Sequence, residues 1–371
     1  MAMEAKHGST MTSDPVAAVA DLASQIGRDG LDCVLFFCSP TYDLDVLSHE
    51  IERTFDCPVI GCTSSGQLGP AGFQKGGLAG VSLAGGGVRV EPYLVRPLAH
   101  CQAQAARIGD AVHLTFETSA AAGRLFGLLL VDGLSLMEER LTAALYQALG
   151  NVPIIGGSAG DDLRFEATFI YFRGRFHADA AVFTVFETQA PFATFKLQHF
   201  VPGPTRLVIT DAVPEERIIR EINGEPAALA YADAVGVPVE RLDATVFSQH
   251  PLIVRIGDDY YGRSIYRLNP DLSFTCLCAI DTGIVVSIGR AVDALTTLEH
   301  AFDAVHETVP EPVLVIGCDC ILRRLEMEES GSAERIGAFL SQNRVFGFST
   351  YGEQFNGVHV NQTFTGIAIG G

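Results

Sequence analysis

Short apolar segments alternate with helical patterns along this chain, and one order of elements recurs three times. Residues 34–37, 128–131 and 313–316 are apolar runs that predict buried strands. Each run is followed by apolar residues at helical spacing, at 46–55, 137–149 and 321–340. A second short strand and a hairpin pattern come next. This repeated strand, helix, strand, hairpin unit predicts an α/β fold with mixed sheets.

The second strand of every unit ends in glycines and hydroxyl residues. These phrases occupy residues 58–66, 153–161 and 344–353. Glycine lets a backbone approach a ligand closely, and serine and threonine offer hydrogen-bond donors. We therefore expect the three phrases to converge and to line one ligand cleft.

The chain is predicted to contain two α/β domains. Its 371 residues exceed the usual size of a single domain, and a group of prolines marks a change of pattern. These are Pro191, Pro202, Pro204 and Pro214. We expect a flexible polar leader at 1–14, a first domain at 15–195 and a second at 196–371. Residues 77–84 and 88–95 are expected to pair as a hairpin around three glycines.

The composition of the chain excludes some classes of binding partner and indicates the cellular compartment. Lys and Arg total 25 against 44 Asp and Glu, a formal net charge of −19, which disfavours nucleic acid and anionic membrane surfaces as partners. No apolar run reaches the roughly 18–20 residues of a membrane span. Nine cysteines, an odd number, fit a reducing compartment. We expect a cytoplasmic protein, and the sequence leaves its oligomeric state open, a dimer included.

Several phrases taken together resemble those of the FIST family. They lie at residues 59–66, 155–161, 222–227, 317–320, 347–353 and 361–363. The resemblance covers about residues 30–371, nearly the whole chain. It implies a sensory protein with an N-terminal and a C-terminal FIST domain.

Segments 319–326, 349–354 and 359–363 are most similar to the stand-alone bacterial FIST proteins that sense nitric oxide through haem. That resemblance implies a haem cofactor, a gaseous ligand and signal transduction in a two-component system. It also implies a separate histidine kinase as the partner.

A haem sensor needs an axial ligand, commonly histidine or cysteine, in an apolar pocket. Around His359, period two places His359, Asn361 and Thr363 on one face of a strand. One interpretation is a solvated polar face over a buried apolar one. The alternative is that His359 enters the ligand cleft with Tyr351 and Glu353. His199, in an apolar run at the expected domain boundary, is the second candidate ligand.

Two Cys-x-Cys pairs are candidates for a metal site. Cys318 and Cys320 follow a buried strand, and Cys276 and Cys278 lie in another. Each pair places two thiols on one face, so the four could meet as a zinc or iron–sulfur site. Their apolar neighbours favour small buried hydrophobic residues instead.

Ser65 and Cys62 raise the possibility of an enzyme with a nucleophile at the first glycine phrase. No G-x-S-x-G phrase surrounds them, and no His or Asp partner is identifiable by spacing. The turns at 63–66 and 158–161 fit an anion- or amino-acid-binding nest as well as ordinary turn chemistry. We expect ligand sensing rather than catalysis.

The main alternative to haem is a FIST sensor for an amino acid or small metabolite. Its polar contacts would include Tyr351, Glu353 and Asn361 as well as the serines and threonines of the turns. A thiol-based metal or redox sensor built on Cys318 and Cys320 is a further alternative.

Overall fold

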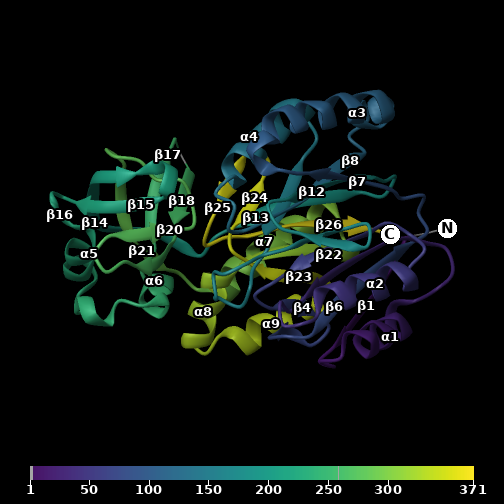
Figure 1. The fold of residues 1–371 in the computed structure, drawn as a ribbon, viewed down its shortest axis with the longest axis horizontal. Coiled ribbons are helices and arrows are strands. Elements are labelled where there is room, and N and C mark those ends of the chain that lie inside the picture. Colours follow the sequence, from purple (N-terminus) through teal and green to yellow (C-terminus); the bar gives the residue numbers. More distant parts are fainter. Residues whose placement is uncertain (1–2, 258) are drawn as a thin grey trace.

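The computed structural model describes residues 3–257 and 259–371, and the chain forms two bodies (Figure 1). We call residues 3–197 and 294–371 the large body and residues 200–291 the small body. The large body contains three six-stranded sheets, and the small body contains one antiparallel sheet. The predicted α/β class, with mixed sheets in two domains, is confirmed.

The three sheets of the large body share one strand order. The first sheet contains β1 (Glu4–Thr10), β6 (Leu78–Ala84), β2 (Leu31–Cys38), β3 (Val59–Thr63), β10 (Ile170–Phe172) and β11 (Arg175–His177). The second contains β7 (Arg89–Val95), β12 (Ala181–Glu187), β8 (Leu125–Val131), β9 (Ile154–Ser158), β24 (Glu353–Phe355) and β25 (Val358–Val360). The third contains β13 (Phe192–Leu197), β26 (Phe364–Gly370), β22 (Pro312–Cys320), β23 (Val345–Thr350), β4 (Gln67–Gly69) and β5 (Gly72–Gln74).

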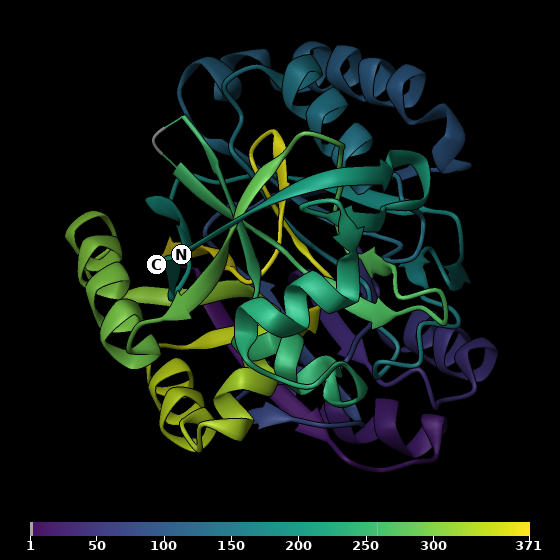
Figure 2. The same cartoon turned by 90° about the vertical axis from the view of Figure 1, so that its left-hand side faces the viewer.

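In each sheet the third and fourth strands are parallel, and helices connect them. These crossover helices are α2 (Leu44–Thr54), α4 (Glu138–Leu149), and α8 (Ile321–Glu329) with α9 (Ala333–Gln342). The remaining helices of the large body are α1 (Pro15–Ile26), α3 (Cys101–Ala121) and α7 (Ala294–Thr308). Figure 2 shows the helices in three groups around the sheets: α3 and α4 in blue, α1 and α2 in purple, and α7 to α9 in yellow-green.

Aspartate side chains cap the N-termini of several of these helices. Asp14 accepts a hydrogen bond from Ala17 N at 2.8 Å, and Asp43 accepts one from Val46 N at 3.1 Å. Such a side chain satisfies one of the backbone donors left free in the first turn of a helix. Helix α1 therefore begins directly after its capping residue, Asp14.

The hairpins are exchanged between the three sheets in a cycle. Hairpin β4/β5, which follows β3, pairs with β23. Hairpin β10/β11, which follows β9, pairs with β3, and hairpin β24/β25, which follows β23, pairs with β9. The chain leaving each glycine phrase therefore crosses to a neighbouring sheet. This exchange brings the three phrases to the middle of the molecule.

Aromatic side chains fill the space between the sheets. The Phe37 ring stacks on Phe346 and Phe348, with centroids 5.3 Å and 4.2 Å apart. These three residues belong to a cluster with members from all three sheets. Strands buried on both faces explain the continuous apolar runs of the sequence.

The small body is an antiparallel sheet covered by two short helices. Its strands are β14 (Phe200–Val213), β15 (Ile218–Ile222), β16 (Glu225–Pro226), β17 (Leu252–Ile256), β18 (Asp259–Arg263), β19 (Ile265–Leu268), β20 (Phe274–Cys276) and β21 (Val285–Ala291). Its helices are α5 (Ala227–Val235) and α6 (Ala244–Gln249). Figure 2 looks onto the molecule from the side on which this body lies.

Three sequence-based expectations differ from the structure. Residues 4–10 form β1, paired with β6 over seven residues, and not a flexible leader. The segment after residue 292 joins the sheets of the large body, so the two bodies do not divide at 195/196. Strands β6 and β7 lie in different sheets and do not form the predicted hairpin, because each pairs with strands distant in sequence.

Among the helices of the described residues, none combines the length and the apolar character that crossing a lipid bilayer requires.

Candidate functional site

The three glycine phrases converge and are hydrogen-bonded to one another through their backbones. Ser349 N donates to Gly66 O at 2.8 Å, which joins the first and third phrases. Ser158 N donates to Gly352 O at 2.8 Å, and Gly160 N donates to Thr63 O at 3.1 Å. Every pair of phrases is therefore in contact, as the sequence predicted. The expected common cleft is not seen, because Ser65 is the one described residue of the three phrases that lines the cavity presented below.

Gly160 lies where two of these phrases touch. A Cβ atom added there would lie 2.4 Å from Ser65 Oγ and 2.9 Å from Ser65 N. We expect Gly160→Ala to lower the free energy of unfolding by about 1–3 kcal/mol, because a methyl group must push two backbones apart. Chemical denaturation of the two proteins measures this difference.

Gly69→Ala is the matched control for Gly160→Ala. A Cβ atom at Gly69 has no atom closer than 3.7 Å. This variant should change the free energy of unfolding by less than about 1 kcal/mol. Equal effects of both substitutions would contradict the close contact of the phrases.

A cavity of about 400 Å³ lies beside the first phrase. Its polar wall is formed by the side chains of Ser39, Thr41, Ser65, Lys75, Asp162 and Glu328. Its apolar wall is formed by Leu163, Ile321 and Leu325. The cavity thus combines one cation, two carboxyl groups and an aliphatic surface, which suits a small molecule that carries both charges.

The charged groups of the cavity are connected to one another. Glu328 accepts hydrogen bonds from Lys75 Nζ at 2.8 Å and from Arg324 Nε at 3.0 Å. Burial alone would raise the pKa of Glu328, but these two cations outweigh burial and lower it. Burial is the main cause that raises the pKa of Asp162. The two carboxyl groups therefore differ in how readily they hold a proton.

Tyr351 and Asp161 support the loop that carries Asp162. Both side chains are buried, and the Tyr351 hydroxyl donates to Asp161 Oδ1. The same hydroxyl accepts a hydrogen bond from Leu163 N at 2.8 Å, and Ser65 Oγ accepts one from Asp162 N at 3.1 Å. Tyr351, a predicted contact residue, thus lies behind the cavity wall.

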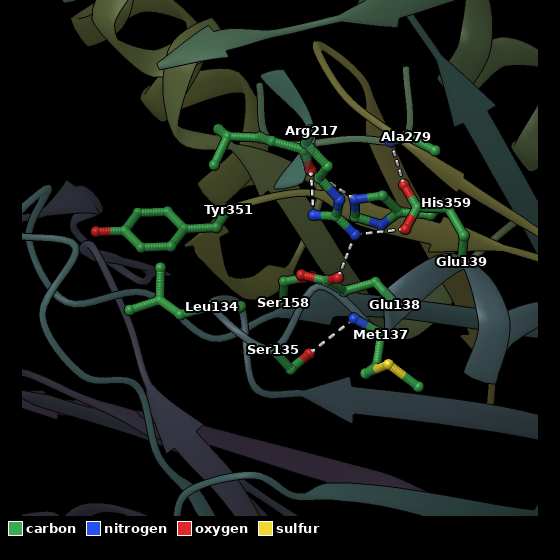
Figure 3. Close-up of polar contacts among 12 residues, drawn as sticks. Leu134, Ser135, Met137, Glu138, Glu139, Ser158, Arg217, Ala279, Tyr351 and His359 are labelled. Atoms are coloured by element: carbon green, nitrogen blue, oxygen red, sulfur yellow. Dashed lines mark hydrogen bonds and ion pairs between the residues drawn. The ribbon is translucent and has the colours of Figure 1, made fainter. Parts of the chain in front are cut away.

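His359 is buried at the contact between the two bodies (Figure 3). Its Nδ1 lies 3.1 Å from Gln354 Nε2, and its Nε2 lies 3.2 Å from Leu277 O of the small body. His359, Asn361 and Thr363 are at most 6% exposed, whereas Val358 is 41% exposed. The interpretation of a solvated polar face is wrong, because hairpin β24/β25 inserts its polar side under the small body.

Arg217 connects the small body to α4 of the large body (Figure 3). Its Nη2 donates to Glu138 Oε2 at 2.6 Å and also to Glu139, while its Nη1 donates to Leu277 O at 3.1 Å. Glu139 Oε1 accepts a hydrogen bond from Ala279 N at 2.6 Å. Burial opposes the charge of Arg217, but Glu138 and Glu139 outweigh it and raise its pKa.

Sequence reasoning missed this ion-pair network. Glu138 and Glu139 lie in the first turn of α4. Acidic residues are common there because the helix dipole favours negative charge at the N-terminus. Arg217 adopts a left-handed backbone with φ of 55° between two short elements. No periodicity in the sequence indicates that these residues meet.

His199 lies in the segment that joins β13 to β14 and is fully buried. Its Nε2 is 3.0 Å from Glu326, and its Nδ1 contacts the Arg323 guanidinium. Burial first, and then the charge of Arg323, lower the pKa of His199 to about 4. The neutral ring therefore accepts from Arg323 and donates to Glu326.

In this arrangement neither candidate histidine offers a free ring nitrogen to a haem iron. Both ring nitrogens of His359 and of His199 already have partners within the protein. Neither histidine lines the cavity beside Ser65. An axial ligand must offer a free ring nitrogen to the iron, so binding would require these hydrogen bonds to break.

Glu353 and Asn361 are fully buried as well. Glu353 Oε2 accepts hydrogen bonds from the Thr363 hydroxyl at 2.6 Å and from Thr363 N at 3.2 Å. Asn361 Nδ2 donates to Tyr351 O at 3.4 Å, and its Oδ1 has no hydrogen-bond partner among the described residues. The described lining of the cavity beside Ser65 includes neither residue.

The two Cys-x-Cys pairs do not meet. Cys318 lies in the apolar cluster of the large body, and Cys276 lies in that of the small body. Burial raises the pKa of Cys318 and Cys320 well above the usual value for a thiol. Within residues 3–257 and 259–371, no group of three or more His, Cys, Asp or Glu side chains could hold a metal ion. The described side chains are therefore not arranged as a four-thiolate site would require, and their burial agrees with the favoured alternative of small buried hydrophobic residues.

The two candidate nucleophiles have different surroundings. Cys62 is fully buried, and burial raises its pKa well above the usual value, so its thiol is a poor nucleophile. Ser65 reaches the cavity, where its hydroxyl already accepts the hydrogen bond from Asp162 N.

Comparisons with known proteins give two matching family models and solved structures with a similar fold. A model described as the FIST N domain matches residues 32–225, and one described as the FIST C domain matches residues 227–356. A search of curated proteins gave no match. The chain is similar to the crystal structure of a cyanuric acid hydrolase from A. caulinodans, with 8% identity over 100% of both chains and a TM-score of 0.38. A likeness this weak carries no argument about function.

Proposed function

The chain belongs to the FIST family, and on this premise we propose that it is a sensory protein whose ligand is a small zwitterionic metabolite such as an amino acid. FIST domains are associated with sensory signal transduction. The observation that supports the ligand class is the cavity beside Ser65, which carries a lysine, two carboxyl groups and an aliphatic wall.

Each part of an amino acid has a counterpart in this cavity. Lys75 and the hydroxyls of Ser39 and Thr41 suit a ligand carboxylate. Asp162 and Glu328 suit an ammonium group, and the aliphatic wall suits an apolar side chain. The volume of about 400 Å³ is within the range of small-molecule sites.

Thermal unfolding of the purified protein in the presence of each of the twenty common amino acids tests this proposal. An amino acid that binds should raise the Tm in a concentration-dependent way, since it binds the folded state alone. Titration calorimetry then gives its Kd. Lys75→Met and Asp162→Asn should each weaken binding by about tenfold or more, because each removes a charged hydrogen-bond partner.

Lys6→Met is the control for Lys75→Met, because Lys6 is exposed on β1 and does not line the cavity. It should leave the Kd unchanged. If no amino acid shifts the Tm, or if Lys75→Met and Lys6→Met bind equally well, the assignment of the ligand is wrong.

The alternative within the family is nitric oxide sensing through haem, with a separate histidine kinase as the partner. His359 is the candidate iron ligand beside the third phrase, since a Cβ atom at Gly352 would lie 2.3 Å from its Cε1. Protein purified after haem supply would then show a Soret absorption band that shifts on addition of nitric oxide. His359→Ala should remove this band, and His306→Ala, in α7 of the large body, should not.

A further inference from the structure

The loop at residues 161–167 lies between the cavity and the small body, and one carboxylate organises it. Asp161 Oδ1 accepts a hydrogen bond from Phe165 N at 2.9 Å. Its Oδ2 accepts from Glu166 N at 2.7 Å and from Ala167 N at 3.0 Å. The loop is therefore closed around a single buried side chain.

The backbone of this loop is strained. Asp162, Leu163 and Phe165 adopt positive φ angles of 60°, 62° and 54°. Non-glycine residues rarely adopt this conformation, and it persists only where surrounding contacts enforce it. The hydrogen bonds to Asp161, Ser65 Oγ and the Tyr351 hydroxyl are those contacts.

The two ends of the strained segment face different sites. Asp162 and Leu163 line the cavity beside Ser65. The Phe165 ring stacks on Tyr351 with centroids 4.8 Å apart, and it contacts Tyr266 of the small body with centroids 4.6 Å apart. Only Arg164 separates the cavity wall from this aromatic contact.

We propose that the loop at residues 161–167 couples occupancy of the cavity to the packing of the small body, with Phe165 as the connecting side chain. The identity of the ligand in this inference rests on the proposed function. The coupling itself does not depend on which ligand binds. A ligand that contacts Asp162 changes the balance of strain in the loop. The Tyr351 hydroxyl holds the start of the loop, and the Asp161 carboxylate holds its end. A change of backbone strain at Asp162 therefore alters the contact between Phe165 and Tyr266.

Hydrogen exchange of backbone amides in residues 265–277 measures this coupling without any ligand. This segment contains β19, β20 and Leu277, which packs in the same apolar cluster as Tyr351. Asp162→Gly relieves the positive φ at the cavity wall. It should change exchange rates in residues 265–277 by roughly two- to tenfold, the range expected of coupled neighbours.

Two comparisons separate coupling from general destabilisation. Arg173→Gly relieves a positive φ of 45° outside the loop, at an exposed position that does not line the cavity, and should leave exchange in residues 265–277 unchanged. In a Phe165→Leu background, Asp162→Gly should no longer change these rates. If Asp162→Gly has no effect, or the same effect with Phe165→Leu, the coupling is absent.

An amino acid that binds adds a second readout. It should slow exchange in residues 265–277 of the unmodified protein, whereas Phe165→Leu should bind it with a similar Kd and show no slowing. If no amino acid binds but Asp162→Gly acts through Phe165, the ligand assignment fails and the coupling stands. If an amino acid binds and slows exchange equally in Phe165→Leu, the coupling proposal fails and the ligand assignment stands.

Discussion

Replacing Arg217 with methionine is expected to lower the free energy of unfolding by about 3–5 kcal/mol, because it leaves a buried carboxylate without its partner. The Arg217 side chain is 4% exposed and that of Glu138 is 1% exposed. Burial is the main cause that raises the pKa of Glu138, and the charge of Arg217 opposes it. Chemical denaturation followed by circular dichroism measures the loss.

Arg53→Met is the matched control for Arg217→Met. Arg53 also pairs with a glutamate, Glu50, at 2.5 Å, but its side chain is 66% exposed. Water and salt screen such a pair, so its loss should cost less than about 1 kcal/mol. If the two arginine variants lose similar stability, the buried network does not hold the bodies together.

The double variant Arg217→Met with Glu138→Leu separates the loss of an ion pair from the burial of an unpaired charge. Replacing both partners by apolar residues removes the stranded carboxylate, and such replacements are often close to neutral. We expect the double variant to recover at least half of the stability that Arg217→Met loses. Glu139 keeps its hydrogen bond from Ala279 N in either variant.

Most elements of this fold follow from local sequence, but their assembly does not. The repeated unit of strand, helix and strand and the convergence of the glycine phrases were both predictable, because apolar period and turn residues act over short distances. The exchange of hairpins between sheets was not. Strands such as β4 and β23 pair although they lie about 280 residues apart in the sequence. No local sequence pattern indicates which strands will pair.

The residues of the candidate site were likewise only partly predictable from the sequence. Ser65 was recognised because it follows a strand and glycines, and it does line the cavity. Asp162 and Lys75 were missed, since a charged residue in a loop normally faces solvent. His359 and Asn361 alternate with valines as a solvated strand would, yet the polar face is buried because the small body covers it. Whether such a polar face is exposed depends on segments distant in sequence that pack over it. The periodicity of the strand gives no information about those segments.

Glu353→Gln is expected to change how stability depends on pH. Burial is the main cause that raises the pKa of Glu353 from 4.5 to about 8, against the hydrogen bonds from Thr350 and Thr363. A folded-state pKa above the unfolded value means that the folded state holds the proton more tightly. Stability from this group is therefore complete below about pH 4.5 and is lost as pH rises towards about 8.

The expected loss is about 1.4 kcal/mol per pH unit between roughly pH 5 and 8, relative to the glutamine variant. Glutamine has no proton to release, so Glu353→Gln should unfold with a flatter pH profile and be several kcal/mol more stable than the unmodified protein at pH 8. Glu329→Gln, at an exposed position on α8, is the control and should keep the profile of the unmodified protein. Denaturation at pH 5, 6, 7 and 8 compares the three proteins. Parallel profiles for all of them would show that Glu353 does not exchange its proton in this range, and that the hydroxyls around it stabilise its charged form as well as water does.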